Sequence, residues 1–154
     1  MDLDHYQYDI KYSFFEFEFI SVGPKGKVRK KVKFLKIGKG IYNFSFADVD
    51  EMTGIDNDKV ISNNGDRNKI LATLANIIYD FTETFNDIII YILANSASRS
   101  RLYQMNISKY YYEIEKKFKV FGYKNGKWQH FQPNQQYESF LVYRKTSLLQ
   151  LIVN

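Results

Sequence analysis

The sequence contains no cysteine, which excludes disulfides, thiolate metal sites and cysteine nucleophiles. It also has no run of about 18 apolar residues, the length that a helix needs to span a bilayer. Residues 1–12 carry the charges of Asp2, Asp4, Asp9 and Lys11 and lack the apolar stretch of a signal peptide. We therefore expect a soluble protein of the cytoplasm, without a membrane partner.

Signatures of catalysis are missing as well. The chain has no Gly-x-Ser-x-Gly elbow, no Walker loop and no His-Glu-x-x-His motif. Its two histidines, His5 and His130, are far apart in the sequence. An enzyme built from this chain would have to use carboxylates, arginines and His130, which is the equipment of a metal-dependent nuclease or phosphotransfer enzyme.

Aromatic residues, in contrast, are abundant. The 154 residues include 13 Tyr, 13 Phe and 1 Trp, and rings of this kind favour half-buried sheet surfaces. A domain typically needs about 100 to 150 residues for one hydrophobic core. We therefore predict a single α+β domain over residues 1–145, followed by an apolar C-terminal tail over residues 146–154.

The spacing of apolar residues predicts the individual elements. Residues 14–21 alternate strictly between phenylalanine on one side and glutamate on the other, as in a strand. The same criteria predict further strands at about 27–37, 41–49, 87–94, 120–123, 128–131 and 137–143. They predict helices at about 66–84, 99–103 and 106–118. The last two helices are either separate or one kinked helix. The predicted fold class is α+β, with an antiparallel or mixed sheet of about six to seven strands and two to three helices packed on one face.

The charges predict how the first two strands pair. Directly opposed residues of an antiparallel pair share a face, and like charges there repel each other. Placing Glu18 opposite Lys31 makes the neighbouring pairs compatible, because Glu16 then faces Lys33, Phe17 faces Val32 and Phe15 faces Phe34. A slip by one residue would place phenylalanine against lysine throughout, so this register is predicted, with slips by two residues as the alternatives.

Two later segments have equally clear signals. Residues 87–94 form an unbroken apolar run, as expected of a strand that is covered on both faces and lies in the middle of the sheet. The pair Asn125-Gly126 tolerates the positive φ angles of a type I′ turn, which predicts a hairpin in which Tyr123 faces Trp128.

The most conspicuous charged segment is the basic stretch at residues 25–39, in a chain of net charge +5. A strand with a basic face could follow a phosphate backbone. This basic face consists of Lys27, Arg29, Lys31 and Lys33. In the predicted register Glu16 and Glu18 neutralise part of it, and lysines also protect exposed sheet edges. A solvated face with ion pairs is therefore the alternative to a nucleic-acid surface.

A second candidate site is the segment that follows the central strand and begins a helix. It contains Ser96, Ser98, Arg99 and Arg101. Free N–H groups and the positive end of the dipole attract anions to a helix N-terminus, and two arginines can clamp an anion there. The alternative is that a serine caps the helix while the arginines pair with Asp48, Asp50 or Asp66.

The third candidate is the acidic segment after the third strand. It contains Asp48, Asp50, Glu51, Asp56 and Asp58. Hard cations bind several carboxylate oxygens, and closely spaced carboxylates can supply them. The ligand order of an EF-hand is not met, because the glycine falls in the wrong place and no glutamate follows at the right distance. Metal binding and a solvated turn are therefore alternatives here.

Several segments also form a recognisable pattern. They are Phe17-Glu18-Phe19-Ile20-Ser21-Val22-Gly23-Pro24-Lys25-Gly26-Lys27, Val32-Lys33-Phe34, Asn43 to Asp50, Thr53-Gly54, Asn63-Asn64-Gly65-Asp66, Lys69 to Thr73, Ser96, Arg99 to Tyr103, and Phe140-Leu141-Val142. With these motifs the chain resembles, over about residues 6–145, a family of small uncharacterised proteins from Bacteroidota. Two places depart from the family pattern, which has Gly at Ala47 and Gly-Ser-Thr at residues 95–97.

The resemblance implies no activity, but it singles out polar positions at strand ends and helix starts. They are Asp48, Asp50, Asn64, Asp66, Arg99, Arg101 and Tyr103. We hypothesise that the aspartates and Asn64 form a polar or metal-binding cluster and converge, at one edge of the sheet, with an anion site made of Ser96, Ser98, Arg99, Arg101 and Tyr103.

Size, charge and the restricted family together favour a small binding module. We expect it to contact a protein partner or nucleic acid, in the context of a toxin–antitoxin or phage-defence locus. The alternative is a phosphoester-directed enzyme, whose aspartates would hold Mg²⁺ or Mn²⁺ beside the arginines. A third hypothesis is a homodimer joined through the apolar tail.

Overall fold

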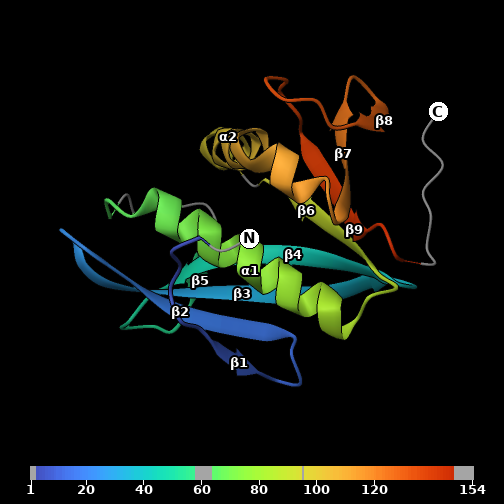
Figure 1. Ribbon diagram of the computed structural model, residues 1–154. Coiled ribbons are helices and arrows are strands. Elements are labelled where there is room, and N and C mark those ends of the chain that lie inside the picture. The colour runs from blue at the N-terminus through green and yellow to red at the C-terminus, as the bar shows by residue number, and fades with distance from the viewer. Residues whose placement is uncertain (1–2, 58–63, 95, 148–154) are drawn as a thin grey trace. The chain divides into compact units, whose positions relative to one another are not determined.

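The structure is a computed structural model that describes residues 3–57, 64–94 and 96–147 (Figure 1). These residues form the strands β1 (Asp9–Lys11), β2 (Glu16–Gly23), β3 (Gly26–Gly38), β4 (Ile41–Val49), β5 (Asp56–Asn57), β6 (Ile89–Leu93), β7 (Phe118–Lys124), β8 (Lys127–His130) and β9 (Ser139–Arg144), and the helices α1 (Arg67–Thr84) and α2 (Ala97–Ile114).

The chain divides into two compact units. The first unit comprises Met1–Leu35 and Ser45–Phe81, and the second comprises Lys36–Phe44 and Thr82–Asn154. Strands β3 and β4 therefore contribute residues to both units. Each unit is described below by itself.

In the first unit the strands follow the order β1-β2-β3-β4, and β5 pairs with β4. Strands β2 and β3 are antiparallel, with Glu16 opposite Lys33 and Glu18 opposite Lys31. The register predicted from the charges is therefore confirmed. Because side chains alternate along a strand, this register places the phenylalanines of β2 on one face and its glutamates on the other.

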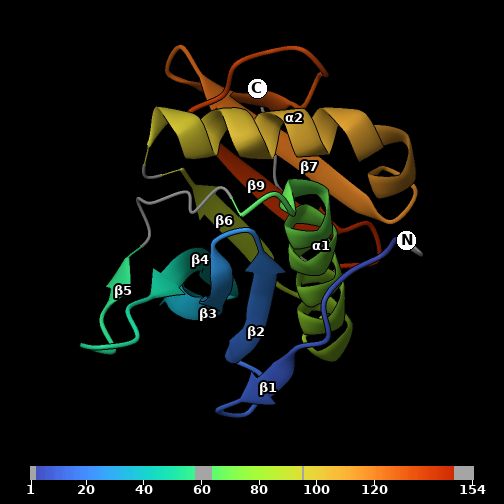
Figure 2. The same ribbon diagram turned by 90° about the vertical axis from the view of Figure 1, so that its left-hand side faces the viewer.

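Helix α1 lies beside β2 (Figure 2), and its Phe81 contacts the phenylalanines Phe15 and Phe34 of the first unit. Phe17, Val32 and Phe81 are fully buried there. The ring of Phe81 stacks on Phe34 with the ring centroids 3.8 Å apart, and the edge of Phe15 also meets it. Burial of such side chains is worth roughly 1.5–3 kcal/mol each, so this layer contributes to the stability of the first unit.

The residues before β1 tie α1 to β2. The backbone N–H of Tyr6 donates to Thr73 Oγ1 over 2.9 Å, and the Tyr6 ring stacks on Phe19. Lys69 of α1 places its ammonium 4.4 Å from the centre of the same ring. This segment joins the helix and the strand in addition to their shared core.

In the second unit the strands follow the order β4-β6-β9-β7-β8. Strand β6 is parallel to β4 and antiparallel to β9, and β7 is antiparallel to both β9 and β8. The pairing is therefore mixed, as one of the predicted alternatives had it. The apolar strand β6 lies between two neighbours, as its unbroken hydrophobic run predicted.

Helix α2 covers one face of these strands. Tyr103 meets the edge of Phe44, and Tyr111 packs against Phe131. The helix is continuous across the two segments predicted separately, and its irregularity lies at Tyr110, which has the non-helical angles φ −109° and ψ 15°. The alternative of a single kinked helix is thus confirmed.

The fold class is α+β as predicted, but the strand count was wrong. Nine strands and two helices occur among the described residues, against a prediction of about six to seven strands. The additional strands are β1 and β5, which have three and two residues. Segments this short show no periodicity, because an alternating pattern needs about four residues to be recognised.

Two other predictions are not decided by these residues. The single domain over residues 1–145 stays a prediction beside the two compact units. Residues 148–154, which include most of the predicted apolar tail, lie outside the described residues. Within the described part of the chain, neither helix is long and apolar enough to cross a membrane.

Candidate functional site

The predicted site residues belong to different units. Asp48, Asp50, Asn64 and Asp66 lie in the first unit, and Ser96, Ser98, Arg99, Arg101 and Tyr103 lie in the second. Convergence of the two groups therefore stays a prediction. Within its own unit, each group has a definite environment.

Asp66 and Asn64 are joined through a buried serine. Asp66 Oδ2 accepts hydrogen bonds from the hydroxyls of Tyr6, over 2.6 Å, and Ser21, over 2.5 Å. The amide Nδ2 of Asn64 donates to Ser21 Oγ over 3.2 Å. Burial, together with the Asp66 carboxylate, raises the pKa of Tyr6 above its ordinary value. Tyr6 therefore stays protonated and donates to the carboxylate.

Asn64 also holds the turn between β2 and β3. Its Oδ1 accepts from the backbone N–H of Lys25 over 2.7 Å, and its Nδ2 donates to the carbonyl of Gly26 over 3.0 Å. Gly23 lies so close that an added Cβ would be 1.8 Å from the carbonyl oxygen of Asn64. Asn64 is only 2% exposed, so these contacts make it a structural residue of the turn.

The two earlier aspartates have separate partners. Asp48 Oδ1 lies 2.5 Å from the ammonium of Lys30, which is 2% exposed and also lies over the ring of Phe46. Asp50 accepts from the backbone N–H groups of Thr53 and Met52, and these bonds lower the pKa of its carboxyl group. Among the described residues, no group of three or more His, Asp or Glu side chains is arranged to hold a metal ion.

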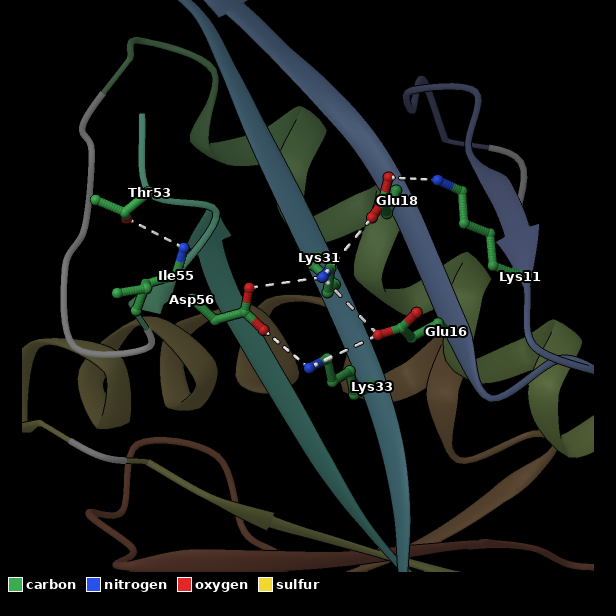
Figure 3. A network of polar contacts seen from close by, with 8 residues as sticks. All are labelled: Lys11, Glu16, Glu18, Lys31, Lys33, Thr53, Ile55 and Asp56. Carbon is green, nitrogen blue, oxygen red and sulfur yellow. Dashed lines mark hydrogen bonds and ion pairs between the residues drawn. The ribbon is translucent and has the colours of Figure 1, made fainter. Parts of the chain in front are cut away.

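Lys31 and Lys33 of the predicted basic face take part in ion pairs (Figure 3). Lys33 pairs with Asp56 at 3.0 Å and with Glu16 at 3.7 Å. Lys31 lies 3.6 Å from Asp56 and 3.9 Å from both Glu16 and Glu18. Glu18 is closer to Lys11, at 2.9 Å, so three carboxylates face three ammonium groups, which agrees with the alternative of a solvated, paired face.

This charged network shifts two pKa values. Burial alone would raise the pKa of Asp56, but the hydrogen bond from Lys33 and the charge of Lys31 outweigh it, so that the pKa lies below its ordinary value. The hydrogen bond to Asp56 correspondingly raises the pKa of Lys33. Both groups are therefore charged at neutral pH.

The predicted anion segment begins α2. Ser96 is the N-cap, and its side chain accepts from the backbone N–H of Arg99 over 3.2 Å. Arg99 is only 3% exposed, and its Nη1 lies 3.5 Å from the hydroxyl of the buried Tyr103. Arg101 and Ser98 are exposed. An anion arriving from solvent would therefore meet Arg101 and Ser98, whereas Arg99 lies inside the protein.

Charge is distributed very unequally between the two units, which sequence reasoning missed. The first unit has 10 basic and 12 acidic side chains, a net charge of −2, and the second has 12 basic and 5 acidic, a net charge of +7. Together they account for all 22 basic and 17 acidic side chains. The conspicuous basic strand thus lies largely in the acidic unit.

The face of the second unit opposite α2 is rich in aromatic rings, and we call it the aromatic face. Its strands bury Ile89, Phe121, Leu141 and Tyr143 as a small core, and Tyr91 and Trp128 pack against that core. The edge of Tyr91 meets the Trp128 ring, with the ring centroids 6.3 Å apart. The exposed Lys119 belongs to the same face, because it lies two residues before Phe121 on β7.

The predicted pairing of Tyr123 with Trp128 is confirmed by the register of β7 and β8, and their ring centroids are 5.1 Å apart. The pairing places both rings on the aromatic face. His130 lies opposite Phe121 in the same hairpin and is exposed. The half-buried rings of Tyr91, Tyr123 and Trp128 therefore form a continuous group beside a histidine and a lysine.

A hollow of about 450 Å³ lies on the other face of this hairpin. It is lined by Lys124, Asn125, Lys127, Gln129, Gln132, Gln135 and Tyr137. The lining therefore combines two ammonium groups and four side-chain amides, without a carboxylate. The spacing of these residues in the sequence gave no signal for a site, because a loop brings Gln132 and Gln135 back to the hairpin.

The buried Lys30 was also missed, although the sequence contains a signal for it. Lys30 alternates with Val28 and Val32, so the period of two already places it on the apolar face. Asp48 follows Phe46 in the same way on β4. A lysine and an aspartate at apolar positions of neighbouring strands indicate a buried ion pair.

Comparison with known proteins gives one family. A protein-family model, described as a family of unknown function (DUF6934), matches residues 2–145. No curated protein and no solved structure matches the chain. The matched residues include most of both compact units.

Proposed function

Because the chain belongs to the family of unknown function DUF6934, which assigns no activity, we propose a function from the chemistry of its own residues: the second unit binds single-stranded nucleic acid. Membership confirms the expected family of uncharacterised proteins, and an origin in Bacteroidota stays a prediction. The proposal depends on one observation, the net charge of +7 on the second unit beside −2 on the first.

Such a concentration of positive charge favours a polyanion. Lysines and arginines release counterions from a phosphate backbone when they bind it, and this release drives association. The second unit offers a local cluster for this purpose, because the backbone N–H of Lys145 donates to the carbonyl of Lys117 over 2.9 Å. Lys119 follows on β7 and is exposed.

The aromatic face favours a single strand over a duplex. Unpaired bases can stack on exposed rings, and each stacked base contributes about 1–3 kcal/mol. Tyr91, Tyr123 and Trp128 lie together on strands of the second unit and are half-buried. Duplex bases are already stacked on each other and cannot use these rings.

The basic strand β3 is a weaker candidate surface. Lys31 and Lys33 face three carboxylates, so a phosphate would have to compete with existing ion pairs. The second unit, which contains Lys119, has 12 basic but only 5 acidic side chains, so most of its positive charge is not neutralised within the unit. Phosphates should therefore be attracted to the second unit and not to β3.

Fluorescence anisotropy tests the proposal. A labelled 12-nucleotide single strand and the corresponding duplex are titrated with the full chain at 50 and 200 mM salt. We expect tighter binding of the single strand and a steep loss of affinity at the higher salt concentration. Equal or tighter binding of the duplex, or no binding of either, would contradict the proposal.

A pair of aromatic variants tests the face itself. Trp128→Ala should weaken binding about 5- to 150-fold, the effect of one lost stacking interaction. Tyr112→Ala is the matched control, because Tyr112 lies on α2 in the same unit and is 72% exposed. Unfolding curves of both variants establish that they are folded at the assay temperature. Equal affinities of the two folded variants would locate binding elsewhere.

A further inference from the structure

The hollow beside the β7–β8 hairpin is built by the turn and by one missing side chain. Asn125 and Gly126 adopt positive φ angles of 53° and 76°, as the predicted type I′ turn requires. The turn sets Lys124 opposite Lys127, and Gly122 opposite Gln129. Lysines and glutamine thus project side by side from two neighbouring strands.

Gly122 allows Tyr137 to form the floor. A Cβ at Gly122 would lie 2.3 Å from the ring of Tyr137, so the ring occupies the space of the absent side chain. The Tyr137 hydroxyl accepts from the backbone N–H of Gln132 over 3.0 Å, which fixes the returning loop. Tyr137 is 2% exposed. The floor is therefore rigid, and the polar side chains stand around it.

The charged and polar groups of the hollow are partly preorganised. Lys124 Nζ donates to Gln135 Oε1 over 2.6 Å. This bond fixes the oxygen of the amide, so its two N–H groups are the part that a ligand can use. An ammonium group has three donors, which leaves further donors of Lys124 for an anion. Lys127 and Gln129 are exposed and add a second positive charge and another amide.

This combination matches a nucleotide better than a simple anion. Side-chain amides present a donor and an acceptor side by side, which is the pattern that base edges complement. Lysines complement phosphate as point charges. A volume of about 450 Å³ is within the usual range of small-ligand sites, roughly 300–1,000 Å³. A phosphate alone would leave most of the amides unused.

We propose that this hollow holds one nucleotide of the bound strand, with Lys124 and Lys127 at its phosphate and the amides of Gln129 and Gln135 at its base edge. The inference rests on the proposed function of the second unit. Strand β8 has β7 as its neighbour and is the last strand in the order of that unit. A strand stacked on the aromatic face therefore reaches the hollow by passing around β8.

If the hollow contacts a base edge, the protein should bind some bases more tightly than others. Stacking alone tolerates every base, whereas a good bidentate contact discriminates by about 1–3 kcal/mol, or roughly 5- to 150-fold. Homo-oligonucleotides of the four bases should therefore bind the full chain with affinities that differ at least about tenfold. Gln129→Leu should reduce this ratio to about twofold while the weakest oligonucleotide keeps its affinity.

Gln136→Leu is the matched control, because Gln136 lies in the same loop, is exposed and does not line the hollow. It should keep the tenfold ratio. Equal affinities of the four oligonucleotides for the unaltered chain, or an unchanged ratio in Gln129→Leu, would overturn the inference. Neither result would affect the proposed function, since Trp128→Ala and the salt dependence test that separately.

A second measurement does not depend on strand binding. Nucleoside 5′-monophosphates are added to the ¹⁵N-labelled chain, and the backbone amide signals of Lys124, Lys127 and Gln135 are followed. Saturable shifts at these residues, weaker with inorganic phosphate alone, support the hollow even if no oligonucleotide binds the aromatic face. Shifts confined to other residues would overturn the assignment of the hollow.

Discussion

Lys30 and Asp48 form an ion pair inside the first unit, and this pair affects the stability of the fold. Lys30 lies on the apolar face of β3, and the carboxylate of Asp48 is 2.5 Å from its ammonium group. Removing one partner of a buried ion pair destabilises the fold more than replacing both partners by apolar residues. The reason is that the remaining charge stays in apolar surroundings. An aspartate that stands out in a sequence pattern can therefore belong to a buried ion pair.

The first prediction concerns this pair. Asp48→Ala removes a neutralising carboxylate from the buried ammonium and should lower the free energy of unfolding by about 3 kcal/mol. The double variant Lys30→Met, Asp48→Leu should recover most of that loss, because apolar side chains suit the site. Urea denaturation measures both. A much smaller loss is expected for Asp50→Ala, whose carboxylate is exposed, and equal effects of Asp48→Ala and Asp50→Ala would refute the distinction.

The second prediction concerns Gly23. An added methyl group would meet the backbone carbonyl of Asn64 at 1.8 Å, and backbone cannot move aside as a side chain can. Gly23→Ala should therefore lower the free energy of unfolding by about 1–3 kcal/mol, the usual cost of overpacking. Gly38→Ala is the control, because its nearest neighbour would be a methyl group of Ile41 at 3.7 Å. Similar urea midpoints for the two variants would contradict this account.

Among the elements, those with a strong local pattern could be predicted from the sequence. Strand β4 has its predicted bounds, and α1 begins one residue after its predicted start. The register of β2 on β3 followed from opposing charges, since a slip by one residue would place both Phe17 and Phe19 opposite basic residues, whereas the observed register does so for Phe19 alone. These features are local or depend on adjacent strands, and the sequence therefore contains enough information to specify them.

The elements that were missed depend on distant partners. Strand β5 has two residues, and it pairs with the end of β4 across a turn held by Asp50. Strand β1 has three exposed residues and exists through its pairing with β2. The hollow depends in the same way on a loop that returns to the hairpin. Neither composition nor periodicity reports contacts of this kind, because tertiary pairing overrides weak local preference.

The third prediction concerns β5 and its ion pairs. The pKa of Asp56 lies below its ordinary value, so the stability that its charge contributes is complete above about pH 5 and is lost as pH falls through the folded pKa, below about 3.9. Asp56→Asn should therefore be less stable than the unaltered chain at pH 7, by less than about 1 kcal/mol because the pair is partly exposed. Thermal unfolding at pH 7, 5, 4 and 3 measures the difference.

The same difference should shrink as pH falls through the lowered pKa of Asp56, where the carboxyl group becomes protonated in the folded state as well. At pH 7 it should also shrink in 0.5 M salt, because salt screens exposed ion pairs. If the stability difference between Asp56→Asn and the unaltered chain stays constant from pH 7 to pH 3, the charge of Asp56 does not stabilise the fold, which contradicts the prediction.

For the molecule as a whole, the difference in net charge between the two units cannot be read along the sequence, because the chain passes from the first unit to the second and back. Residues 36–44 belong to the second unit although the first unit continues on both sides of them. A count along the sequence therefore mixes the two units and attributes the net charge of +5 to the basic stretch at residues 25–39. Once the units are known, the excess of positive charge is assigned to the second one.

The last prediction follows from that assignment. For a single strand, the logarithm of the binding constant falls with the logarithm of salt concentration with a slope of about −0.7 per phosphate contacted. Lys119→Gln should reduce this slope by about 0.7, because Lys119 is an exposed lysine of the aromatic face. Lys33→Gln, which changes net charge equally but removes a lysine paired with Asp56, should leave the slope unchanged. Equal changes in both variants would mean that total charge, and not the second unit, attracts the nucleic acid.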